Sequence, residues 1–116
     1  MALPGIASYF RASSDDERSH ALQFIDYQLL RGGRVRLSPV NAPSPESLLG
    51  TAGGGAGAEA LEAFELVLQL EKLVTVKLKD LAIAAEGVGD RQLQGFVDNM
   101  LTHQAEDINK VVRSRR

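Results

Sequence analysis

Two ionisable residues, Glu17 and His20, stand three positions apart in the middle of an otherwise mostly apolar helical stripe. The spacing of the stripe alternates between four and three residues, which is typical of a helix packed in a bundle. An ionisable Glu is rarely buried unless another group compensates its charge. A metal ion between helices would supply that compensation, because Glu-x-x-His places both side chains on one helix face. The stripe comprises Ile6, Phe10, Ser13, Glu17, His20, Phe24 and Tyr27.

A Glu-x-x-His pair also occurs by chance in many helices, usually on the side that faces solvent. The same spacing recurs in carboxylate bundles that bind two metal ions. The metal interpretation gains weight because two further segments carry a polar residue in an apolar seam. The seam of the first of these comprises Leu61, Phe64, Leu68, Glu71, Thr75, Leu78, Ala82 and Ala85.

Glu71 has an alternative interpretation, in which it lies at the edge of its stripe and pairs with Lys72 or Lys77 on the surface. The third segment starts at Asp90, a predicted N-cap after three residues that include two glycines. Its polar seam residue is Gln104, which in many cores makes only a structural hydrogen bond. The third seam comprises Leu93, Val97, Met100, Gln104, Ile108 and Val111.

The ionisable and amide residues of the three seams, which are Glu17, His20, Glu71 and Gln104, offer oxygen or imidazole donors and no thiolate. Such a donor set suits iron, manganese or zinc better than copper(I) or an iron–sulfur cluster. The chain has no cysteine, which excludes a disulfide framework and thiol chemistry. The candidate catalytic and metal-ligating residues are therefore Glu17, His20, Glu71 and Gln104.

The composition restricts the class of protein. A chain of 116 residues predicts a single domain over residues 1–116. Its net charge of −2 and its pI of about 5.6 argue against a nucleic-acid partner that is bound through phosphates. No apolar run is long enough to span a membrane, and no secretory signal is visible.

The pattern predicts an all-α fold with three long helices, at residues 5–31, 59–87 and 90–114. Residues 32–58 are rich in proline and glycine, so we expect a long crossover loop that leaves the first two helices parallel. The glycine-rich part, residues 51–58, lacks a phosphate-loop pattern and is interpreted as a flexible linker. The short connection before Asp90 predicts that the last two helices are antiparallel.

Three segments together resemble the ferritin family, and plant and green-algal ferritins most of all. The first, Asp15 to Leu37, contains Glu-Arg-x-His-Ala and Gln-x-x-Arg-Gly-Gly-Arg, as in the second ferritin helix and its following loop. Glu59 to Val74 resembles the third helix with its Leu-Glu-Lys, and Phe96 to Ile108 resembles the fourth. The resemblance covers nearly the whole chain except the glycine-rich stretch.

This resemblance implies a ferritin-like four-helix bundle that assembles with other ferritin subunits into a hollow cage of twenty-four. It implies oxidation of Fe(II) by O2 at a di-iron site inside the bundle, and storage of the ferric mineral. Glu17 looks like the carboxylate that bridges the two irons, and His20 like the imidazole ligand of the first iron. Glu71 is similar to the ligand of the second iron, and Gln104 to its hydrogen-bonding neighbour.

The chain departs from the family pattern in several places. Nothing matches the preceding family helix, which supplies another Glu ligand and a Tyr, or the short final helix, so we expect a truncated chain. His103 stands where the family has a Glu, and residues 96–104 are one residue shorter than usual. Gly95 replaces an acid of the iron channels, whereas Asp98 supplies the second one.

Three functions follow as hypotheses. The first is an iron-storing ferroxidase subunit that is intracellular, in the cytoplasm or a plastid, without a visible transit peptide. The second is a catalytically inactive fragment or structural partner of full-length ferritin, favoured by the missing first helix. The third is a helical interaction module without metal, which requires Glu17, His20, Glu71 and Gln104 to be unrelated.

Overall fold

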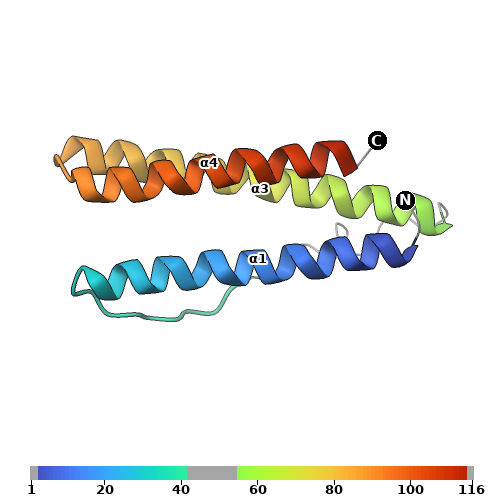
Figure 1. The fold of residues 1–116 in the computed structure, drawn as a ribbon, viewed down its shortest axis with the longest axis horizontal. Coiled ribbons are helices and arrows are strands. Elements are labelled where there is room, and N and C mark those ends of the chain that lie inside the picture. The colour runs from blue at the N-terminus through green and yellow to red at the C-terminus, as the bar shows by residue number, and fades with distance from the viewer. Residues whose placement is uncertain (1–2, 42–54, 115–116) are drawn as a thin grey trace. The chain divides into compact units, whose positions relative to one another are not determined.

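The computed structural model describes residues 3–41 and 55–114, which contain three helices and no strand (Figure 1). The helices are α1, Leu3–Leu30, α3, Gly55–Gly87, and α4, Arg91–Ser114. The predicted all-α class is confirmed for this part of the chain. The chain divides into two compact units, Met1–Ala42 with α1 and Pro43–Arg116 with α3 and α4, and each is described by itself.

The start of α3 differs more from the prediction than the starts of α1 and α4, which lie within two residues of it. α3 begins at Gly55, four residues before the expected Glu59, so the predicted loop of residues 32–58 is too long at its C-terminal end. Glycine costs about 1 kcal/mol relative to alanine inside a helix but does not forbid one, and Ala56 and Ala58 favour it. Residues 42–54, with the start of the predicted glycine-rich linker, lie outside the described residues. The single domain and the parallel first two helices stay predictions.

The C-terminus of α1 is closed by two adjacent glycines. Gly32 adopts a left-handed φ of 81°, and its N–H donates to the Leu29 carbonyl over 3.0 Å. The Gly33 N–H donates to the Gln28 carbonyl over 2.9 Å, which completes a Schellman cap. A Cβ at Gly33 would lie 2.8 Å from Gln28 Cγ, so a larger residue there would require Gln28 to shift. The predicted C-cap is therefore present, and residues 33–41 continue without regular structure.

α3 and α4 lie side by side and are joined by a tight turn (Figure 1). Gly89, with a φ of 70°, ends α3 in a second Schellman cap, since its N–H and that of Asp90 donate to Glu86 and Ala85. Asp90 then starts α4, because its Oδ1 accepts the Leu93 N–H over 3.0 Å. The predicted N-cap is correct, and the two helices are antiparallel as expected.

Apolar side chains fill the space between α3 and α4. Most predicted seam positions are buried or half-buried, but Leu61 is 48% exposed, so its assignment to the seam was wrong. Glu71 faces Gln104 across the pair, which puts residue 61 level with residue 114, the last of α4. The buried apolar residues of the pair are Phe64, Leu68, Leu78, Ala85, Val97, Met100 and Val111.

Candidate functional site

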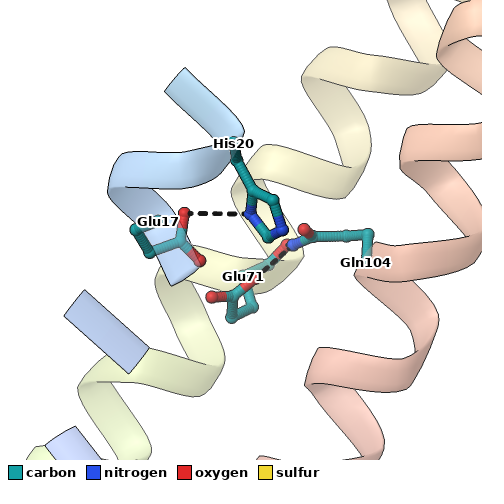
Figure 2. A network of polar contacts seen from close by, with 4 residues as sticks. All are labelled: Glu17, His20, Glu71 and Gln104. Atoms are coloured by element: carbon teal, nitrogen blue, oxygen red, sulfur yellow. Dashed lines mark hydrogen bonds and ion pairs between the residues drawn. The ribbon is translucent and has the colours of Figure 1, made fainter. Parts of the chain in front are cut away.

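Glu17 and His20 project from one face of α1, one turn apart (Figure 2). The Glu17 Oε2 lies 3.7 Å from the His20 Nδ1, which is longer than a hydrogen bond. The Glu17 side chain is 54% exposed, whereas that of His20 is 20% exposed. Donor atoms at this separation can share one cation, since metal–ligand bonds to imidazole and carboxylate are about 2 Å long. α1 thus presents one carboxylate and one imidazole together.

Glu71 and Gln104 meet across the α3/α4 pair (Figure 2). The Gln104 side chain is buried at 5% exposure, and its Nε2 donates to the Glu71 main-chain carbonyl over 2.8 Å. The same nitrogen donates to the Glu71 carboxylate oxygen Oε2. The Thr75 hydroxyl donates to the Glu71 carbonyl over 2.9 Å. These contacts hold Glu71 toward α4 rather than at the outer edge of its stripe.

An amide donor favours the ionised form of the carboxylate that it contacts. A carboxylate has several lone-pair positions, so accepting one N–H bond leaves it the capacity to bind a cation. In the alternative interpretation, Gln104 makes only a structural hydrogen bond. That hydrogen bond is present, and it leaves Glu71 able to bind a metal ion. Gln104 fixes where that carboxylate points.

The four candidate residues fall into two pairs, each brought together within its own unit. A common site for Glu17, His20, Glu71 and Gln104 stays a prediction. His103 lies on a more exposed part of α4, where its Nδ1 is 3.8 Å from the Glu106 carboxylate. Asp98 is exposed as well.

Sequence reasoning missed Asp107. This residue lies one turn after Gln104 on α4, it is half-buried, and its Oδ2 atom is buried. The predicted seam steps from Gln104 to Ile108 and passes over it. The signal that could have found it is the spacing of three from Gln104 and of four to Val111, which is as regular as the step that was chosen.

Comparison with known proteins places the chain in a family. A family model described as the ferritin-like domain matches residues 1–113. The chain is 46% identical over 112 residues to "Ferritin-2, chloroplastic" of Zea mays, and 43% identical over 112 residues to "Ferritin-1, chloroplastic" of Brassica napus. Each match covers 96% of this chain and 42% of the relative, so the chain spans less than half the length of these relatives.

Both matches extend through α1, α3 and α4, and the helical content fits a ferritin-like helical bundle. None of the helices, over the residues described, is long and apolar enough to cross a membrane. The family model and the relatives agree with the resemblance carried by the Glu-x-x-His and Arg-Gly-Gly motifs. The chain belongs to the ferritin family.

Proposed function

We propose that this chain works in iron storage, as a ferritin subunit or a part of one that oxidises Fe(II) with O2. The observation that carries the proposal is the contact between buried Gln104 and Glu71, in a chain that matches the ferritin-like domain over residues 1–113. A metal-binding carboxylate needs support from neighbouring hydrogen bonds, and Gln104 supplies it. The relatives are named as ferritins, which supports the same function.

Each candidate residue has a distinct part in this proposal. Glu17 would bridge two Fe(II) ions, and His20 would bind the first through its imidazole. Glu71 would bind the second ion, with Gln104 as its positioning residue. Carboxylate oxygens favour the ferric product over the ferrous substrate, because hard, anionic ligands stabilise the higher charge.

The reaction requires two iron ions together. Each of two Fe(II) ions gives up one electron, and one O2 accepts both electrons with two protons from water to give hydrogen peroxide. The two Fe(III) ions then hydrolyse to ferric oxyhydroxide and release protons. Two substrate ions held by a shared carboxylate allow this two-electron transfer to a single O2.

The proposal includes partners and a compartment. Large apolar side chains of α3 are exposed, and exposed apolar surface of this kind is typical of interaction surfaces. Other ferritin subunits are the partners that we propose, assembled as a cage around the mineral. The two relatives named above carry the word "chloroplastic", which supports a plastid location for this protein. The exposed apolar residues of α3 are Leu61, Leu70, Leu73, Val74, Val76 and Ile83.

Aerobic oxidation of Fe(II), followed as ferric absorbance and O2 uptake, tests the proposal. We expect rapid oxidation with two Fe(II) consumed per O2, lost in the double variant Glu17→Ala/His20→Ala. The matched control is Asp16→Ala/Ser19→Ala, which changes two exposed residues with the same spacing on the same helix. Wild-type oxidation no faster than that of the site variant would contradict the proposal and favour an inactive structural partner.

A further inference from the structure

The seam of α3 contains two polar residues one turn apart, Glu71 and Thr75. The proposed function gives a part to Glu71 and none to Thr75, which is half-buried. Because Glu71 faces Gln104 in an antiparallel pair, one turn later on α3 corresponds to one turn earlier on α4. Met100 occupies that level and is buried. Thr75 therefore lies in the α3/α4 seam, where its hydroxyl requires a hydrogen-bond partner.

The partner of the Thr75 hydroxyl is the main-chain carbonyl of Glu71, over 2.9 Å. The same carbonyl oxygen accepts the Gln104 Nε2 over 2.8 Å. In a regular α-helix it also accepts the N–H of residue 75. A hydroxyl that bonds to the carbonyl four residues earlier often bends the helix. The direction of the Glu71 carbonyl thus depends on two side chains, one from each helix.

The Glu71 carbonyl is also an anchor for the amide of Gln104. An amide nitrogen carries two hydrogens, so it can donate to the carbonyl and to the Glu71 carboxylate at once (Figure 2). The carboxylate rotates about its side-chain bonds, whereas the carbonyl is held by the helix. A change in the direction of the carbonyl would move the amide, and with it the hydrogen that the carboxylate accepts.

We propose that Thr75 is a positioning residue for the metal ligand Glu71, acting through the shared carbonyl and the amide of Gln104. This inference rests on the proposed function, because it assumes a metal ion bound at Glu71. Threonine suits the role, since its χ1 angle is restricted and a bond to the carbonyl four residues earlier fits one of its preferred helical rotamers. Hydrogen bonds that orient a ligand in this way contribute to metal affinity.

Equilibrium binding of Co(II) without O2 tests the positioning role apart from turnover. Co(II) accepts the same donors as Fe(II), and its visible absorption spectrum reports its ligand geometry. Thr75→Val replaces the hydroxyl with a methyl group of similar size. We expect it to weaken Co(II) binding about tenfold, the lower end of the range for groups that support a metal ligand, and to change the Co(II) spectrum.

Thr75→Ser separates positioning from packing. Serine keeps the hydroxyl and should recover most of the Co(II) affinity, although it fills the seam less well than valine. If Thr75 acted only by packing, valine would bind Co(II) as the wild type does and serine would bind it more weakly. That order of affinities would overturn the inference.

Thr102→Val is the matched control. The Thr102 hydroxyl donates to the Asp98 carbonyl over 3.2 Å, which is the same bond to the carbonyl four residues earlier, at an exposed position of α4. This variant should leave the Co(II) affinity and spectrum unchanged. All apo variants should retain the helical circular dichroism of the wild type, which separates a displaced ligand from loss of the fold.

A double variant tests the route through Gln104. In a Gln104→Ala background, Thr75→Val should weaken Co(II) binding by less than about twofold, because residues that act through one another have non-additive effects. A loss in that background as large as in the wild-type background would show that Thr75 does not act through the amide, and it would overturn the inference.

Glu71→Gln distinguishes failure of this inference from failure of the proposed function. It should weaken Co(II) binding, whereas Asp80→Asn, which removes a charge at an exposed position of α3, should not. If Glu71→Gln weakens binding but Thr75→Val matches the wild type in affinity and spectrum, the inference is overturned alone. If the wild-type chain binds no Co(II), or Glu71→Gln binds as well as the wild type, the proposed site is overturned together with the inference.

Discussion

At the scale of single residues, one amide does most to define the candidate site. Gln104 is buried, and its nitrogen reaches both the main chain and the carboxylate of Glu71 on the neighbouring helix. Hydrogen bonds to charged groups contribute about 1.5 to 3 kcal/mol to stability, more than neutral ones. The Gln104 side chain therefore both joins α3 to α4 and orients a proposed metal ligand.

Replacing Gln104 with alanine should lower the free energy of unfolding by about 2 to 3 kcal/mol, because it removes both bonds to Glu71 and leaves a cavity. Urea denaturation followed by circular dichroism measures the change. Gln69→Ala is the control, since Gln69 is exposed on α3, and it should change the unfolding free energy by less than about 0.5 kcal/mol. Equal effects of the two variants would show that the contact contributes nothing to stability.

The sequence predicted that Glu71 and Gln104 lie in the seams of their helices, but it did not predict the half-buried position of Asp107. A polar residue in a run of apolar seam positions is visible from spacing alone, and the seam at Phe64, Leu78 and Val97 is buried as expected. Asp107 was missed because the step from Gln104 to Ile108 and the step from Gln104 to Asp107 are equally regular, so spacing alone does not choose between them. Which atom of Gln104 meets Glu71 depends on the register of the helix pair, which spacing does not specify.

At the scale of the helices, the caps determine where each element begins and ends. Two Schellman caps with left-handed glycines close α1 and α3, and Asp90 follows directly as the N-cap of α4. These ends were predictable because Gly and Asp have specific backbone roles. The start of α3 at Gly55 was not predictable in the same way, since the glycines there only weaken the helix.

Replacing Gly89 and Gly95 of the α3/α4 unit with alanine should change the free energy of unfolding in opposite directions. Gly89→Ala forces a Cβ into a left-handed conformation and should destabilise the fold by about 1 kcal/mol. Gly95 lies inside α4, and a Cβ added there would have no atom within 4 Å other than those of its chain neighbours and of the α4 backbone. Gly95→Ala should therefore stabilise the fold by up to about 1 kcal/mol, since alanine favours a helix more than glycine does. Urea midpoints of the two variants and the wild type provide the comparison. A midpoint for Gly89→Ala above that of Gly95→Ala would contradict the cap assignment.

At the scale of the whole molecule, the proposed chemistry depends on residues from two units. Glu17 and His20 belong to the unit with α1, whereas Glu71 and Gln104 belong to the α3/α4 unit. The family match runs through both, over residues 1–113. An ion bound by ligands from both units would link their folding, because binding to the native state alone stabilises everything that forms the site.

The melting temperature with and without Fe(II), measured without O2, tests that central claim most directly. At Fe(II) a hundredfold above its dissociation constant the native state should gain about 2.7 kcal/mol, which raises the melting temperature by roughly 10 °C for a chain of this size. Glu17→Ala and Glu71→Gln should each abolish most of that rise, whereas Asp80→Asn should keep it. No rise in the wild type, or a rise that survives either site variant, would contradict an iron site shared by α1 and the α3/α4 pair.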